Sequence, residues 1–151
     1  AQMRCKAHLT LMASIDQTIE EFADEFALLP DWEERISYVI ELARALAPLA
    51  DGERTENNRI RGCVSRVWLV SEKHAEEPEK LFFRGGSDAH LVRGEIAMLL
   101  RIFSGRTPAE ILSVDPKAVF ERLGLKDALT MQRSNGLFSM MSRIQDEARA
   151  A

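Results

Sequence analysis

Cysteine and histidine are scarce in this sequence of 151 residues, which holds two cysteines, Cys5 and Cys63, and three histidines. Two cysteines so far apart are too few for a disulfide framework, and they fit a protein of a reducing compartment. A tetrahedral metal site or an iron-sulfur scaffold needs several thiolates or imidazoles within reach of one another. We therefore expect a cytoplasmic protein without a metal site.

The sequence also lacks an excess of basic residues and any long apolar run. Its 24 acids and 20 bases leave a formal charge of -4, whereas a nucleic-acid partner normally demands a basic surface. The apolar runs are short and interrupted by charge, so none has the length that a transmembrane helix requires. The Gly85-Gly86 pair lacks the spacing and the lysine of a phosphate-binding loop. These absences predict no nucleic-acid partner, no membrane span and no cofactor.

The chain has the size of one ordinary domain, whose core is large enough to be stable without disulfides or metals. Residues 1–13 are weakly basic and lack the long apolar stretch of a secretory signal. We expect residues 1–13 to be a disordered or non-native extension. Residues 14–151 are expected to form the single folded domain.

Helical patterns cover most of that domain, because apolar residues recur every three or four positions and capping residues mark several helix starts. Ser14 and Gln17 can form a capping box, and Gly94 inside a later helix indicates close packing against a neighbour. The expected helices run from Ser14 to Leu29, from Asp31 to Leu46 with Trp32, Val39 and Ile40 toward the core, from Ser87 as N-cap to Phe103, from Thr107, from Asp115 to Gly124, and from about Ser134 toward the end.

Two segments rich in β-branched and aromatic residues, 64–71 and 80–84, predict strands joined by a polar turn around residues 74–79. A third short strand, 59–61, would complete an antiparallel sheet. After Gly85 and Gly86 the pattern returns to helix. The expected fold class is α+β, a single, mostly helical domain around a small three-stranded antiparallel sheet.

Cys63 stands where a polar loop runs into the first strand, a common way to mount a reactive group on a rigid element. Gly62 before it can adopt backbone conformations closed to other residues. Arg59, Arg61 and Arg66 surround the cysteine without an acid between them, and a positive field favours the reactive thiolate. Free cysteine is also among the most buried residue types. The residues alone leave both interpretations open, a nucleophile and a small core residue.

A cysteine protease would pair Cys63 with a histidine base held by Asn or Asp. His90 follows Asp88 two residues later, so the sequence leaves a triad open. Histidine at the start of a helix is more often a surface residue, however, and no protease signature surrounds Cys63.

Four ordered motifs between about residues 26 and 148 carry a resemblance to a known family. They are W-E-E-R-I-S-Y-V-I-E-L-A, R-G-C-V-S-R-V-W around Cys63, G-S-D-A-H-L-V-R-G-E-I-A-M-L-L, and L-T-M-Q-R-S-N-G-L. The sequence resembles the SufE family of sulfur acceptors, and this resemblance implies the SufE/IscU-like fold. The three-cysteine site of the IscU scaffolds has no counterpart here.

The resemblance implies a sulfur carrier with no turnover of its own. Cys63 would accept sulfur as a persulfide from a SufS-like cysteine desulfurase, stimulate that enzyme, and pass sulfur toward a SufBCD-type cluster scaffold. Pyridoxal phosphate chemistry would belong to the desulfurase. The residues expected to support Cys63 or contact the partner are Gly62, Arg61, Ser65, Arg66, Asp88, His90 and Arg133. For Asp88 and Arg133, plain structural roles as a helix-start acid and a capping or surface arginine stay equally open.

The rival function from another class is a non-covalent adaptor that binds a desulfurase or another protein through its helices, with Cys63 only structural. For the carrier, an apolar pocket raises the pKa of the thiol while the neighbouring arginines lower it. We expect burial to win in the free protein. Docking would then swing the thiol outward, with Gly62 as the hinge.

Overall fold

The computed structural model describes residues 13–125 and 129–151. The expectations for Cys5 and for residues 1–12 therefore lie outside the described residues. The strands are β1 (Val67–His74) and β2 (Glu77–Ser87), and the short 3-10 turns are η1 (Ala43–Ala45) and η2 (Asp51–Glu53). The α-helices are α2 (Ile15–Ala27), α3 (Trp32–Leu42), α4 (His90–Phe103), α5 (Pro108–Leu112), α6 (Pro116–Leu123) and α7 (Met131–Ala150).

Polar side chains at the helix starts satisfy backbone N–H groups that have no partner within the helix. The capping box of Ser14 and Gln17 before α2 is confirmed, with both hydrogen bonds present. Asp31 caps α3 by accepting from the N–H of Glu34, and Gly124 ends α6 in the left-handed conformation. Helix α7 starts three residues earlier than expected, because the Thr130 hydroxyl accepts from the N–H of Arg133.

The sheet is a two-stranded antiparallel hairpin, so the expected third strand is wrong. Residue Arg59 makes only an isolated bridge with Trp68, since the chain turns into a tight loop directly after Ile60. Strand β1 begins and ends three residues later than expected, and β2 runs three residues further at each end. Gly85 and Gly86 therefore lie inside β2, opposite Leu69 and Trp68. A Cβ at Gly85 would lie 2.8 Å from a methyl carbon of Ile96 in α4. These glycines do not end the strand. They allow Ile96 and Leu49 to pack closely against it.

The start of α4 also differs from the expectation. Ser87 is the last residue of β2, and Ala89 takes the N-cap position without a side-chain hydrogen bond. The Ser87 hydroxyl donates instead to the backbone carbonyl of Arg66, 2.6 Å away. A serine expected to begin a helix therefore joins the strand to the segment that carries the cysteine.

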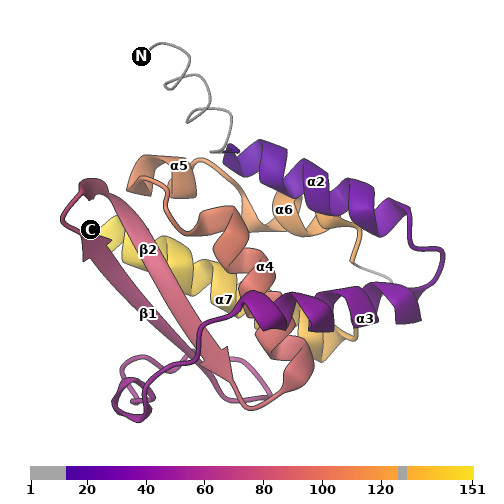
Figure 1. Ribbon diagram of the computed structural model, residues 1–151, viewed down its shortest axis with the longest axis horizontal. Coiled ribbons are helices and arrows are strands. Elements are labelled where there is room, and N and C mark those ends of the chain that lie inside the picture. Colours follow the sequence, from indigo (N-terminus) through magenta and orange to yellow (C-terminus); the bar gives the residue numbers. More distant parts are fainter. Residues whose placement is uncertain (1–12, 126–128) are drawn as a thin grey trace.

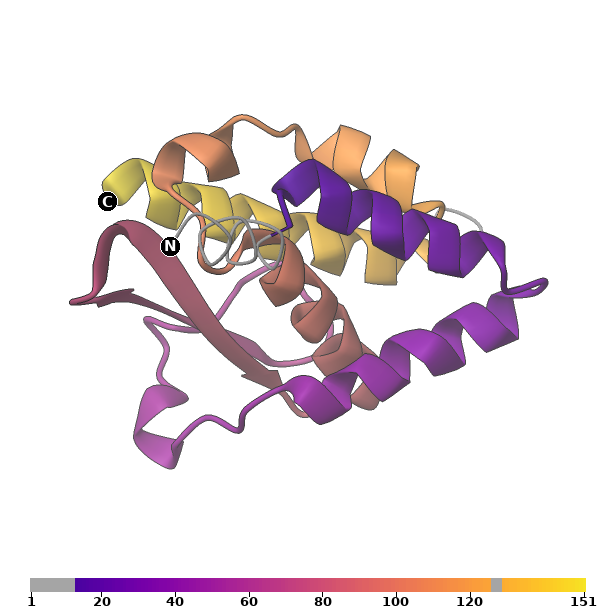
Figure 2. The same cartoon turned by 45° about the horizontal axis from the view of Figure 1, so that its top comes forward.

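Helix α4 runs between the hairpin and the helices α2 and α3 (Figures 1 and 2), and it contacts all of them. Its tight contact with α3 confirms the expectation for Gly94, where a Cβ would lie 2.0 Å from the backbone oxygen of Val39. Val39 is buried as expected, but Trp32 and Ile40 are 58% and 38% exposed. The expectation that they face the core is therefore wrong, and Ile40 instead lines a hollow that α3 shares with η1 and the start of α4. Within the described residues, no helix has the length and apolar character to cross a membrane.

Candidate functional site

Residues 61–66 form a tight loop, here called the cysteine loop. The N–H of Ile60 donates to the oxygen of Val67 at 2.8 Å and closes it, and the N–H of Leu69 donates to the oxygen of Asn58 one step further out. Gly62 takes a φ of 87° inside the loop, and a Cβ there would lie 2.6 Å from the Ser139 hydroxyl oxygen of α7. Glycine is therefore required at this position for two reasons. The backbone is left-handed there, and α7 approaches too closely to leave space for a side chain.

Cys63 belongs to this loop, and its side chain is half-buried and packs against the hydrophobic core. Its Sγ lies 3.6 Å from the backbone oxygen of Gly136, the distance of a weak S–H hydrogen bond. The sulfur lies close to the surface of α7 at Gly136, where a Cβ would make an ordinary contact with Sγ at 3.7 Å. Helix α7 thus forms the floor under the thiol, whereas the next residue, Val64, is 70% exposed.

The arginines near Cys63 are paired with carboxylates, which the local sequence did not indicate. Arg59 and Arg61 lie 3.6 and 3.8 Å from Glu56, and Arg66 lies 3.1 Å from Asp88. Burial raises the pKa of the Cys63 thiol, and the Glu95 carboxylate raises it further. The direction agrees with the expectation that burial wins in the free protein.

Hydrogen bonds fasten the second half of the cysteine loop to the start of α4 and to α7. Asp88 accepts from the backbone N–H of Arg66 at 3.2 Å and from its side chain at 3.1 Å. This guanidinium holds the pKa of Asp88 below its ordinary value. On the other side, Arg133 donates to the Ser65 hydroxyl at 3.2 Å. Both Asp88 and Arg133 therefore act on the loop itself in this conformation.

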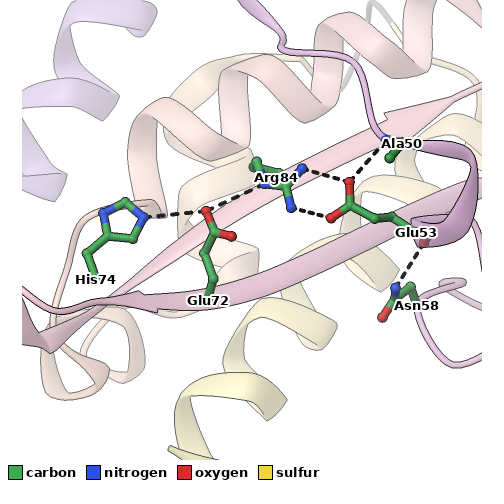
Figure 3. Close-up of polar contacts among 6 residues, drawn as sticks. All are labelled: Ala50, Glu53, Asn58, Glu72, His74 and Arg84. Carbon is green, nitrogen blue, oxygen red and sulfur yellow. Dashed lines mark hydrogen bonds and ion pairs between the residues drawn. The ribbon is translucent and has the colours of Figure 1, made fainter.

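The segment that leads into the cysteine loop is fastened to the outer side of the hairpin (Figure 3). Glu53 of η2 forms a two-pronged ion pair with Arg84 of β2, and its own backbone oxygen accepts from the Asn58 side chain at 2.9 Å. The Arg84 guanidinium lowers the pKa of Glu53 to about 2. Arg143 of α7 adds hydrogen bonds to the backbone oxygens of Asn57 and Arg59. Both ends of the cysteine loop are thus held, while its tip carries few bonds.

Glu95 is a residue of this site that the analysis of the sequence missed. It points inward from α4 with a side chain only 1% exposed, and neither carboxylate oxygen has a hydrogen-bond partner among the described residues. Burial raises its pKa to about 7, against a smaller lowering by Arg133. The signal was present, because an acid stands between Val92 and Leu99 on the apolar face of a helix.

His90 stands apart from the thiol. It is the first residue of α4, and its Nδ1 lies 2.6 Å from the Arg93 guanidinium. Its ring lines a cavity of about 310 Å³ between η1, the end of β2 and the start of α4, together with Arg44 and Arg54. The sulfur of Cys63 contacts a backbone oxygen instead of an imidazole, so the geometry gives no support to a protease triad.

A second hollow of about 570 Å³ adjoins the cysteine loop on the side of Arg61. It lies between the segment before the loop and α7, and its lining includes Ser139 and Arg143. Across residues 13–125 and 129–151, no group of three histidine, cysteine or acidic side chains is placed to hold a metal ion. The site therefore has one thiol, which packs against the apolar core and is bordered by polar side chains such as Arg61 and Arg143.

Comparison with known proteins shows which family the chain resembles. The family model for SufE, described as an Fe-S metabolism associated domain, matches residues 20–148. An uncharacterized SufE-like protein of Rhizobium etli is 45% identical over 95% of this chain and 95% of its own length. Another from Rhizobium meliloti is 47% identical over 91% of this chain and 96% of its own length.

A solved structure supports the fold. The solution structure of a hypothetical protein from Thermus thermophilus matches with a TM-score of 0.72 and 23% identity, over 89% of this chain and 95% of that one. The match to the family model and the two relatives cover nearly the whole chain, including all of the residues around Cys63. The chain therefore belongs to the SufE family.

Proposed function

We propose that this protein accepts sulfur from a SufS-like cysteine desulfurase on Cys63 and carries it toward iron-sulfur cluster assembly on a SufBCD-type scaffold. The observation that carries the proposal is the placement of Cys63 in a SufE-family chain, half-buried in a loop held at both ends. A structural core cysteine needs no such loop, because regular structure can bury it more simply. The link to Fe-S metabolism comes from the family itself.

The transfer step is a thiol exchange. The Cys63 thiolate attacks the outer sulfur of a persulfide on the donor cysteine. The bond between the two donor sulfurs breaks, the inner sulfur leaves as a thiolate, and a new S–S bond forms on Cys63. No electrons are gained or lost overall, so the step needs no oxidant, metal or cofactor of this chain. The desulfurase is then free for another turnover.

The geometry of the loop supports a carrier that releases its thiol on docking. Gly62 already has a left-handed backbone next to Cys63, so it can absorb a change of direction at small cost. Among the described residues, the sulfur makes one weak hydrogen bond, to Gly136, and otherwise packs against the apolar core. The loop can therefore move the thiol outward while Ile60 and Val67 keep its base closed.

Sulfur acceptance is tested with the Cys63→Ser variant. After incubation with a SufS-like desulfurase and cysteine, we expect the parent to gain about 32 Da per sulfur, lost on reduction, and the variant to gain nothing. The variant should also lose stimulation of desulfurase turnover while keeping its affinity for the enzyme. Cys5→Ser is the control and should behave as the parent. Full stimulation by Cys63→Ser would instead establish a non-covalent adaptor.

A further inference from the structure

Glu95 has no evident reason to be buried. Its side chain is 1% exposed, and both carboxylate oxygens lack a hydrogen-bond partner among the described residues. An unpaired carboxylate in an apolar interior is unfavourable, whereas an apolar side chain of similar volume would stabilise the same helix face. A group retained at such a cost calls for a role beyond packing.

The position of Glu95 follows from the packing of α4 and α7. Leu99 of α4 and Met140 of α7 line one small apolar space together with Ile60 and Val67, which close the cysteine loop. The two helices run in the same general direction (Figures 1 and 2). Glu95 lies one helical turn before Leu99 on α4, and Gly136 lies one turn before Met140 on α7. Gly136 contacts the sulfur of Cys63.

The other charged groups around the thiol are already engaged with partners. On the cysteine loop, Arg61 pairs with Glu56 and Arg66 pairs with Asp88. On α7, Arg133 donates to the Ser65 hydroxyl, and its charge only partly offsets the effect of burial on Glu95. Glu95 is therefore a buried carboxylate without a hydrogen-bond partner among the described residues, and its charge acts on the thiol.

We propose that Glu95 is a positioning residue that keeps Cys63 in the neutral thiol form while the cysteine loop is closed. Its negative charge opposes a second negative charge on the sulfur above it. When the loop opens, the sulfur moves away from Glu95 and into water, so the reactive thiolate forms only where a partner can meet it. The use of this effect in sulfur transfer rests on the proposed function. The effect itself is a property of the free protein.

The size of the effect depends on pH because burial raises the pKa of Glu95 to about 7. Well below that pH, Glu95 is neutral and does not oppose the thiolate. Above it, the carboxylate is charged and the pKa of Cys63 is raised. The influence of Glu95 should therefore be absent in acid, appear as the pH passes about 7, and vanish again once Cys63 is fully ionised.

The test is the rate of iodoacetamide labelling of Cys63 in the free protein between about pH 5.5 and 10, read from the Cys63 peptide by mass. Glu95→Gln removes the charge and keeps the shape, and Glu95→Leu removes the polar group as well. Both should label about three- to tenfold faster than the parent at about pH 8, because the charge that opposes the thiolate has been removed. At about pH 5.5 they should match the parent. Glu121→Gln, which removes an exposed acid on α6, is the matched control and should follow the parent at every pH.

A structural effect would look different. A loop merely loosened by the substitution labels faster by the same factor at all pH values below the thiol pKa, and that result overturns the proposal. Equal rates for parent and both Glu95 variants overturn it as well. The labelling experiment involves no desulfurase. Its result therefore does not depend on whether the sulfur-transfer test with Cys63→Ser succeeds or fails.

Discussion

At the scale of single residues, two glycines lie next to the thiol and differ in how well they would tolerate a side chain. Gly62 lets the backbone turn through a φ of 87° while the Ser139 hydroxyl lies against it. Gly136 gives the sulfur a place on the surface of α7. A side chain at Gly62 would strain the left-handed backbone and would also clash with Ser139. A methyl group at Gly136 would only make an ordinary contact with the sulfur.

Gly62→Ala should therefore lower the free energy of unfolding by about 1 to 2 kcal/mol, because a left-handed backbone is costly for residues with a Cβ. Urea unfolding measures the change. Adding Ser139→Ala should restore the part of the loss that is due to the 2.6 Å contact. Gly52→Ala is the control, since a Cβ there meets nothing within 4 Å and its φ is not left-handed. A neutral Gly62→Ala would show that the loop rearranges freely.

At the scale of elements, α3 and α4 pack against each other in close contact. Gly94 sits at their crossing, where a Cβ would lie 2.0 Å from the backbone oxygen of Val39. Backbone cannot yield as a flexible side chain does, so the helices would have to separate. Glu95 is the neighbour of Gly94 along the chain, and a shift of α4 would also move it relative to Cys63.

Two helix glycines should respond to alanine with opposite signs. Helix propensity alone favours alanine over glycine by about 1 kcal/mol in a helix interior. Gly136→Ala in α7 should gain up to about that amount in urea unfolding, since its Cβ lies 3.7 Å from Sγ of Cys63. Gly94→Ala in α4 should instead lose more than about 3 kcal/mol, because the clash exceeds the propensity gain. A gain for both variants would mean that α3 and α4 are not packed as described.

The whole molecule combines carboxylates whose pKa values move in opposite directions on folding. Arg84 lowers the pKa of Glu53 to about 2, so this group stabilises the fold above its ordinary value of 4.5 and ceases to do so as the pH falls toward 2. Burial raises the pKa of Glu95 from 4.5 to about 7, so its contribution is most favourable below pH 4.5 and is lost as the pH rises through 7. Stability should accordingly be greatest between these two transitions.

The Glu95→Leu variant should separate these effects. A pKa raised from 4.5 to about 7 corresponds to roughly 3 kcal/mol of stability lost by the parent as the pH rises through that interval. The stability difference in favour of the variant should therefore grow from about pH 4.5 to 7 and stay constant above, as urea unfolding at each pH would measure. The loss toward pH 2 that depends on Glu53 should remain in both proteins. A difference that does not change with pH would place the Glu95 carboxylate in contact with water.

The sequence predicted the helical elements and the family well because their signals are local. Capping residues such as Ser14 and Asp31, and apolar repeats such as those of α2, act within one or two turns of chain. The number of strands was mispredicted, since a segment such as 59–61 forms a strand only if its neighbours leave room for a ladder. Trp32 and Ile40 were expected in the core but are exposed, because an apolar helix face in the sequence does not indicate which element packs against it.

By itself, the sequence determined the α+β class, the SufE family and Cys63 as the candidate residue, because these follow from local patterns and ordered motifs. Only the tertiary structure decided the electrostatics of the thiol. Cys63 is surrounded by positive charge along the chain, yet folding half-buries the thiol, pairs Arg61 and Arg66 with carboxylates, and lets the charge of Glu95 on α4 act on the sulfur. Electrostatic forces act through space, so the pKa of a buried group depends on neighbours that stand far away in sequence as well as on adjacent ones.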